Sequence, residues 1–293
     1  MILSANLKGA LLMMGSMAAF TFNGACIKLV AEDLPLFQIV FLRGVLTTVF
    51  IGALAYALGL RSLAIPRKDW GRVAGRTGAE IASMVAFLIA LVHMPLANVS
   101  SILAALPLTI TLAGAVFLGE PVGWKRLAAI LVGFTGVLMI VKPGAEGFNV
   151  YSLVAVLAVL LVTARDLFTR RFSDGVPSLA VAVITAGSVG TFGGILMLWQ
   201  GWEPVTGREA GLVAGAAFFI IGGYLFSIMV MRVGEIGFVA PFRYTALIWA
   251  LLLGWFVFGD WPRPLTLLGA AIVVSTGIFT LYRERKLREA ADG

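Results

Sequence analysis

Cysteine and histidine are nearly absent from this sequence of 293 residues, which contains only Cys26 and His93. One cysteine cannot supply a disulfide framework or a cysteine-rich metal site. One histidine leaves no second imidazole to share a metal ion. We therefore expect no metal site and no cofactor.

Charged residues are also scarce. They make up 13% of the chain, against about 25% in an ordinary soluble domain, whereas hydrophobic residues reach 60%. One membrane crossing needs about 20 apolar residues, so the chain can hold about ten crossings with little left for a soluble domain. The composition excludes a soluble globular protein and predicts an all-α integral membrane protein.

Ten apolar runs are long enough to cross a membrane. Turn-forming residues such as Pro35, Pro95 and Pro177 separate several of them. The runs cover residues 7–30, 36–60, 73–92, 96–118, 124–142, 149–169, 178–200, 210–231, 238–258 and 264–282. Ten transmembrane helices joined by short loops are predicted.

Lysine and arginine collect at alternate ends of these runs. With the N-terminus inside the cell, fifteen of the 22 basic residues fall on the cytoplasmic side and four on the outer side, while Arg43, Arg165 and Arg243 lie within runs. Basic residues beside a span stay cytoplasmic, so both termini are predicted to be cytoplasmic, in the inner (plasma) membrane. The charge of +7 then reflects topology and contact with the lipid bilayer, and no nucleic-acid partner is expected.

The chain repeats itself at a shift of about 140 residues. The aligned pairs include Gly114 with Gly254, Gly119 with Gly259, Glu120 with Asp260 and, at a shift of 142, Pro35 with Pro177. Two five-helix halves follow, residues 1–143 and 144–293. Because each half crosses the membrane an odd number of times, the second half must be inverted, an architecture typical of secondary transporters with alternating access.

The repeated segments share an apolar helix, a turn with glycine and an acidic residue, and a glycine-rich helix. They are residues 95–99, 117–121, 124 and 131–137 in the first half and 237–241, 259–260 and 268–277 in the second. This pattern resembles the EamA family of the drug/metabolite transporter superfamily over essentially the whole chain. Bacterial exporters of aromatic and neutral amino acids look most similar. The resemblance implies ten helices in two inverted five-helix repeats and transport of metabolites, but it does not define the substrate.

A secondary transporter that exports amino acids is therefore the leading hypothesis. Export or uncoupled passage of other metabolites or drugs is the alternative. A channel would need a selectivity filter or a ring of charge, and an intramembrane enzyme would need two histidines or a nucleophile with a base, patterns that we do not find. Small four-helix members of the superfamily exchange protons through a first-helix glutamate, whereas residues 11–25 contain no acid. The sequence is compatible with a monomer or a homodimer.

Polar side chains inside apolar runs are candidates for substrate binding, because an unpaired polar group in hydrocarbon is costly. Ser101 and Thr109 form a polar stripe on one face of the fourth run, and the repeat aligns this stripe with Thr245 and Trp249 in the ninth run. Pro107 is expected to interrupt the helix of the fourth run. The predicted substrate-binding residues are Phe20, Asn23, Ser101, Thr109, Tyr224, Thr245 and Trp249. The alternative for their hydroxyl and amide groups is hydrogen bonding between helices.

Four charged residues lie inside the runs near their predicted cytoplasmic ends. They are Glu80, Arg165, Asp166 and Arg243. We predict that they act in gating or proton coupling, with direct substrate contact, mutual pairing or snorkelling as alternatives. Asp69, in contrast, is expected to be an ordinary loop charge.

Overall fold

The computed structural model describes residues 5–59, 64–119, 122–141, 149–173, 175–230 and 239–292. Every regular element within these ranges is a helix. The elements are α1 (Ala5–Val30), α2 (Leu36–Ala57), η1 (Arg67–Asp69), α3 (Trp70–His93), α4 (Leu96–Leu103), α5 (Leu106–Leu118), α6 (Trp124–Val141), α7 (Tyr151–Arg170), α8 (Ser178–Gln200), α9 (Gly207–Val230), η2 (Ala240–Tyr244), α11 (Thr245–Phe258) and α12 (Pro264–Asp292).

The lengths of these helices match a membrane. In the described part of the chain, nine helical segments are long and apolar enough to cross it, and Pro264–Thr280 adds a shorter apolar helix. The ten predicted runs coincide with these segments to within a few residues, except that α12 continues to Asp292 because its last residues favour helix. The protein is a multi-pass membrane protein.

The fourth span is broken, as the sequence predicts. Helix α4 ends before Ala104 and Ala105, and α5 begins with Pro107 in its first turn. Proline has no N–H, so the carbonyl of Leu103 loses its helical partner. The ninth span is also divided near a proline. Pro241 lies in the 3-10 helix η2, and α11 follows it directly.

Gly119 and Gly259 end α5 and α11 in the same way. Both have a positive φ, 69° and 67°, which residues with a side chain rarely adopt. Both helices close with a backbone hydrogen bond to a glycine carbonyl, Gly114 in α5 and Gly254 in α11. These four glycines are the residues that the internal repeat aligns, so the two segments share a local backbone conformation.

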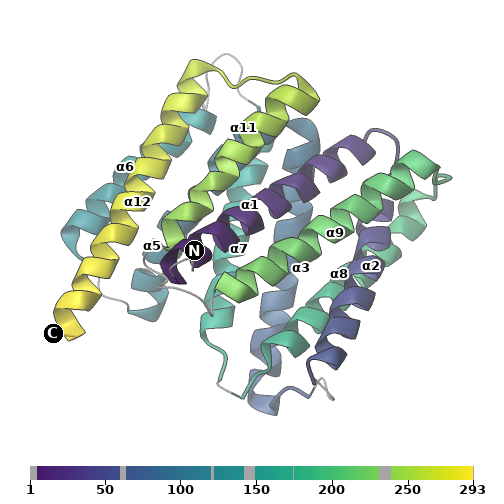
Figure 1. Ribbon diagram of the computed structural model, residues 1–293, viewed down its shortest axis with the longest axis horizontal. Helices are drawn as coiled ribbons and strands as arrows, with labels where there is room; N and C mark the ends of the chain where they lie inside the picture. Colours follow the sequence, from purple (N-terminus) through teal and green to yellow (C-terminus); the bar gives the residue numbers. More distant parts are fainter. Residues whose placement is uncertain are drawn as a thin grey trace.

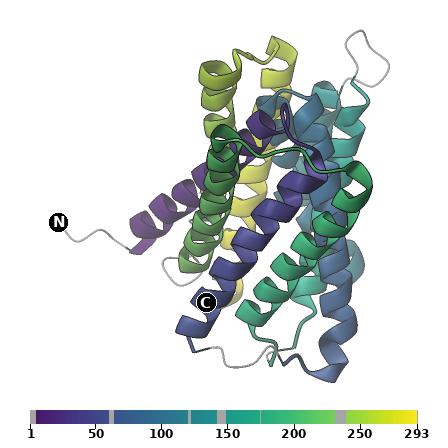
Figure 2. The same cartoon turned by 90° about the vertical axis from the view of Figure 1, so that its right-hand side faces the viewer.

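The most extensive helix contacts join the two parts of the chain. Helix α1 packs along α9, α3 along α7, α2 along α8 and α6 along α12. Figure 1 shows α6 and α12 at one edge of the bundle and α2 and α8 at the opposite edge, with α1 and α9 side by side between them. Figure 2 is the view from the edge formed by α2 and α8.

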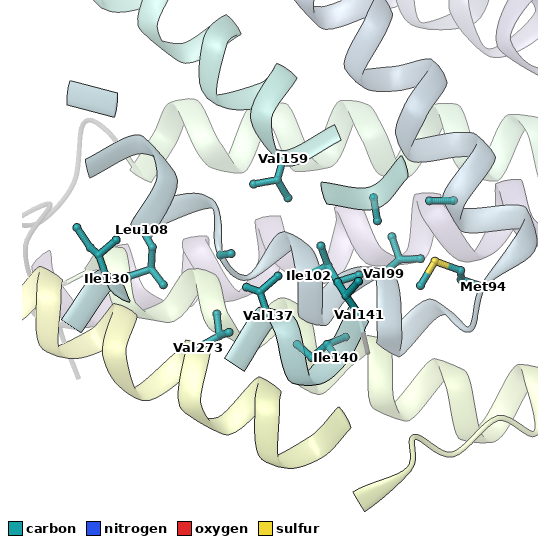
Figure 3. Packing of buried hydrophobic residues seen from close by; sticks show 13 residues of the cluster. Met94, Val99, Ile102, Leu108, Ile130, Val137, Ile140, Val141, Val159 and Val273 are labelled. Carbon is teal, nitrogen blue, oxygen red and sulfur yellow. The ribbon is translucent and has the colours of Figure 1, made fainter. Parts of the chain in front are cut away.

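A buried apolar cluster lies where α4, α5, α6, α7 and α12 meet (Figure 3). Val99, Ile102, Leu108, Ile130 and Val273 are fully buried in it. In a bilayer the lipid is as apolar as this core, so helices gain less from the hydrophobic effect and more from close packing. The cluster therefore stabilises the bundle mainly through van der Waals contact.

Close packing is most evident where glycines meet. A Cβ atom on Gly136 of α6 would lie 2.6 Å from the carbonyl oxygen of Gly269 of α12. A Cβ atom on Gly44 of α2 would lie 2.5 Å from the Cα of Gly190 of α8. Both helix pairs at the edges of the bundle therefore depend on small residues that let their backbones approach.

Candidate functional site

An ion-pair network connects α3 and α7. Arg165 lies between two carboxylates, with Nη1 3.1 Å from Glu80 Oε2 and Nη2 2.7 Å from Asp166 Oδ1. Arg76, one turn before Glu80, lies 3.8 Å from the same oxygen. The four side chains are 15 to 28% exposed. The structure therefore brings together three of the four residues predicted for gating, and it pairs them with one another.

The network extends to α8 through Thr185, which is buried. Arg76 Nη1 donates a hydrogen bond to Thr185 Oγ1 at 2.8 Å, and the hydroxyl of Thr77 lies 3.4 Å from the same atom. The polar network thus connects α3, in the first part of the chain, to α7 and α8 in the second part.

Arg243, the fourth predicted gating residue, lies apart. Its side chain is exposed on η2, and none of the ion pairs between described residues includes it. It interacts electrostatically with Asp166 and Arg165. Arg243 therefore belongs to the surroundings of the network rather than to its bonded core.

The prediction that Asp69 is an ordinary loop charge is wrong. Its side chain is fully buried and lies 2.7 Å from Arg72 Nη1. It also accepts hydrogen bonds from the hydroxyl and the backbone N–H of Ser173, the latter at 3.4 Å. The contact joins the start of α3 to the segment after α7. Ser173 is 104 positions away from Asp69 in the sequence, so the sequence around Asp69 does not reveal this contact.

A second polar contact joins α1 to α2 within their spans. Arg43 Nη1 donates a hydrogen bond to Asn23 Oδ1 at 3.2 Å, and the two residues are only 7% and 5% exposed. Asn23 is one of the predicted binding residues, whereas Arg43 was assigned no role from the sequence. The sequence could have identified Arg43, because a charged residue inside an apolar run is itself a functional candidate.

Aromatic rings lie beside this contact. The ring centroids of Phe20 and Tyr224 are 5.5 Å apart with an interplanar angle of 85°, the edge-to-face arrangement that aromatic pairs favour. One turn earlier on α1, Ser16 donates a hydrogen bond to the Gly223 carbonyl at 2.8 Å and lies 2.8 Å from the Ser227 hydroxyl. Helices α1 and α9 are therefore held together by both polar and aromatic contacts.

Phe20 and Tyr224 add aromatic rings to this part of the bundle, because Phe20 lies three residues before Asn23 on α1. Guanidinium and amide groups are suited to carboxylates, and aromatic rings are suited to apolar side chains. This part of the bundle therefore has the mixed chemistry that binds a small amphipathic molecule.

Trp249, a further predicted binding residue, is half-buried among aromatic residues. Its ring lies 6.5 Å from that of Phe22, which in turn stacks on Phe219 at 5.1 Å. The indole N–H is buried, and no described residue accepts a hydrogen bond from it. A buried indole N–H usually has an acceptor, so this donor is left unsatisfied among the described residues.

The remaining three predicted residues use their hydroxyl groups within the protein. Helix α4 packs against α11, so Ser101 and Thr245 lie on neighbouring helices, whereas Thr109 lies on α5. The hydrogen bonds are Ser101 to the Ala97 carbonyl at 2.7 Å, Thr245 to the Phe242 carbonyl at 2.7 Å, and Thr109 with Thr163 of α7 at 2.7 Å. Such bonds satisfy the hydroxyl proton locally. Of the three, the bond between Thr109 and Thr163 matches the alternative of hydrogen bonding between helices, whereas those of Ser101 and Thr245 are local.

A groove of about 570 Å³ lies away from these residues, between α2 and α8. Thr48, Gly187 and Phe192 belong to its lining, which includes none of the predicted site residues. Among the described residues, no three histidine, cysteine, aspartate or glutamate side chains are grouped as metal ligands.

Comparison with known proteins gives one family. A sequence model of the EamA-like transporter family matches residues 7–142 and again residues 149–282. Together the two matches cover most of the chain.

Several transporters of assigned function are similar to this chain. The pseudopaline exporter CntI of Pseudomonas aeruginosa is 28% identical over 274 residues, which cover 92% of this chain and 95% of that protein. A riboflavin transporter of Vibrio cholerae is 27% identical over 288 residues, 96% of each chain. An S-adenosylmethionine uptake transporter of Rickettsia conorii is 26% identical over 205 residues, 69% of each chain. None of these three is named as an amino-acid exporter.

A known crystal structure has a similar fold. It superposes with a TM-score of 0.69 over 95% of this chain and 98% of the other, at 19% sequence identity. At this identity the likeness concerns the fold alone.

Proposed function

The chain belongs to the EamA-like transporter family, and we propose that it exports amino acids with aromatic or other large apolar side chains. It acts as a secondary transporter of the inner membrane with both termini in the cytoplasm. Two inverted five-helix halves, residues 1–143 and 144–293, move against each other so that a site near the midplane opens alternately to the two sides.

The pattern of helix contacts supports two equivalent halves. Helices α1 and α7 occupy equivalent positions in the repeat, and they pack along α9 and α3, which are also equivalent. The pairs α2 with α8 and α6 with α12 each join a helix to its own counterpart. A two-fold relation between halves produces this pattern, and the opposite basic bias of equivalent loops requires its axis to lie in the membrane plane.

The observation that carries the amino-acid proposal is the position of Tyr224. Its ring packs edge-to-face on that of Phe20, and Phe20 lies three residues before Asn23, whose buried amide accepts a hydrogen bond from Arg43. A zwitterion needs polar partners of both kinds close to an apolar surface for its side chain. The unpaired indole N–H of Trp249 adds a donor beside a second aromatic surface.

The ion-pair network is proposed to act as the gate. It joins α3 to α7 and α8, so movement of one half against the other must stretch or break its contacts. Glu80 and Asp166 are also the carboxylates that would carry a coupled proton, because residues 11–25 offer no acid.

The relatives support an alternative in which the substrate is another metabolite. They are named for pseudopaline, riboflavin and S-adenosylmethionine, so the same fold serves several substrates. A coupled exporter and an uncoupled facilitator also remain to be distinguished by experiment.

Counterflow into proteoliposomes containing the pure protein tests the proposal. We expect unlabelled tryptophan or phenylalanine inside the vesicles to drive uptake of labelled phenylalanine more strongly than alanine does. Riboflavin and S-adenosylmethionine serve as competing substrates, and protein-free vesicles serve as the control. Exchange of one of these metabolites without exchange of any amino acid would disprove amino-acid export. Repeating the assay with a pH gradient separates coupled from uncoupled transport.

A further inference from the structure

We infer that Arg43 is the residue that binds the carboxylate of the transported substrate, so that the site selects molecules with a free carboxylate. This inference rests on the proposed function and names the chemical group that the site recognises. It begins from the different environments of the arginines inside the spans.

Arg165 and Arg76 are neutralised by protein carboxylates, whereas Arg43 is not. Arg165 contacts both Glu80 and Asp166, and Arg76 lies within 4 Å of Glu80. No ion pair between described residues includes Arg43. Its hydrogen-bond partner is the uncharged Asn23 amide.

The burial of Arg43 makes this difference important. The residue is only 7% exposed, and an unpaired charge inside a membrane protein is costly unless it faces a cavity or a partner. The ion-pair network contains two cations, Arg76 and Arg165, and two carboxylates, Glu80 and Asp166, so the buried Arg43 adds a cation that no carboxylate of the network contacts. Positive charge is therefore in excess, and an anionic ligand would balance it.

The free hydrogen-bond donors of Arg43 suit a carboxylate. A guanidinium carries five N–H groups, and the bond to Asn23 uses one of them. Because Asn23 accepts through Oδ1, its amide nitrogen remains a further donor. A planar guanidinium can bind both oxygens of one carboxylate.

The neighbours of Arg43 favour an amino acid over a simple inorganic anion. Asn23, the hydrogen-bond partner of Arg43, lies three residues after Phe20 on α1, and the ring of Phe20 packs edge-to-face on that of Tyr224. A ligand with its carboxylate on Arg43 would therefore have aromatic rings nearby for an apolar side chain.

The second half of the chain lacks an equivalent cation. The shift of 142 that aligns Pro35 with Pro177 also aligns Asn23 with Arg165 and Arg43 with Thr185. Thr185 is an uncharged residue that already accepts a hydrogen bond from Arg76. The carboxylate site is therefore asymmetric and lies in the first half.

The test compares ligands that differ in one group. Phenylalanine, phenylalaninamide, phenylpropionate and phenyl phosphate are offered as competitors of phenylalanine counterflow in wild-type proteoliposomes. We expect phenylalanine and phenylpropionate to compete, and phenylalaninamide to need a concentration higher by about tenfold or more, because it lacks the charged acceptor. Equal competition by the amide, or stronger competition by phenyl phosphate than by the carboxylates, would overturn the assignment.

The variants Arg43→Gln and Arg43→Lys test the residue itself. Arg43→Gln should weaken phenylalanine binding by about tenfold or more without changing the response to phenylalaninamide. The affinity of Arg43→Lys for phenylalanine should lie between those of the wild type and Arg43→Gln. Arg263→Gln, at an exposed position, is the matched control. An Arg43→Gln protein that keeps the wild-type preference for the acid would overturn the inference.

A binding assay separates this inference from the transport proposal. The increase in Tm of the detergent-purified protein is measured with each of the four ligands. Carboxylates should raise Tm in the wild type and in Arg43→Lys but not in Arg43→Gln, even where no amino acid is transported. Stabilisation by carboxylates that persists in Arg43→Gln would exclude Arg43 as their site.

Discussion

The guanidinium of Arg165 on α7 lies 3.1 Å from the carboxylate of Glu80 on α3. The two residues are 85 positions apart in the sequence, and they belong to the two segments that match the transporter family separately. A charge pair between these segments is sensitive to their relative position, because Coulomb attraction weakens as the charges separate.

Replacing Glu80 with glutamine is expected to destabilise the protein. The change leaves Arg165 with Asp166 alone and removes the carboxylate near Arg76. A fully buried pair would lose about 3–5 kcal/mol, but these side chains are 15 to 23% exposed, so we expect a loss of about 1–3 kcal/mol in unfolding free energy. Thermal unfolding in detergent measures it. The exposed Glu203→Gln is the control, and a Tm equal to wild type would contradict the prediction.

Neutralising both Glu80 and Asp166 is expected to remove the pH dependence of transport. They are the carboxylates of the network, and a proton that moves with the substrate needs a group that changes its protonation. Counterflow and gradient-driven uptake are measured over a range of pH for the double variant and for Glu203→Gln. Unchanged pH dependence in the double variant would exclude both carboxylates as the proton carrier.

Replacing Gly136 with alanine is expected to destabilise the contact between α6 and α12. Its Cβ would lie 2.6 Å from the Gly269 carbonyl oxygen, and overpacking costs typically about 1–3 kcal/mol. Gly211→Ala is the matched control, since a Cβ there meets nothing within 4 Å and alanine favours helix by about 1 kcal/mol. A lower Tm for Gly211→Ala than for Gly136→Ala would show that this packing argument is wrong.

Replacing Trp249 with alanine is expected to reduce transport of aromatic amino acids more than transport of alanine. The variant removes both the ring near Phe22 and the unpaired indole donor. Loss of an aromatic contact and a hydrogen bond corresponds to about a tenfold decrease in affinity for aromatic substrates. Trp249→Phe should keep the ring contact and lose less. An equal decrease in the transport of the substrates tryptophan and alanine would instead indicate that the Trp249 side chain has a structural role.

Reporter fusions test the predicted topology. Fusions at the C-terminus and in the loop around residues 61–72 are expected to report the cytoplasm, and one near residue 144 the outside, because basic residues collect on the cytoplasmic side. An external C-terminus would contradict both the ten-span topology and the inverted repeat.

Much of the fold was predictable because it depends on local properties. An apolar run of about 20 residues favours a helix across the bilayer wherever it occurs in the chain. The break before α5 follows from the missing N–H of Pro107. The matching conformations of Gly119 and Gly259 follow from the repeat that aligns them.

The candidate site was predictable only in part. Glu80, Arg165 and Asp166 were recognised because charges inside apolar runs are rare, and the structure pairs them. The same criterion applies to Arg43, but its importance depends on what lies nearby. Asp69 appeared to be a loop residue and is buried by a contact with Ser173.

The sequence alone determined that this chain crosses a membrane many times and where its spans lie, because hydrophobic length and proline act locally. Only the tertiary structure decided which polar groups meet. Pairing depends on the rotation of each helix about its axis and on contacts between helices distant in sequence. For that reason Arg165 has carboxylate partners and Arg43, on a helix of similar composition, has an amide.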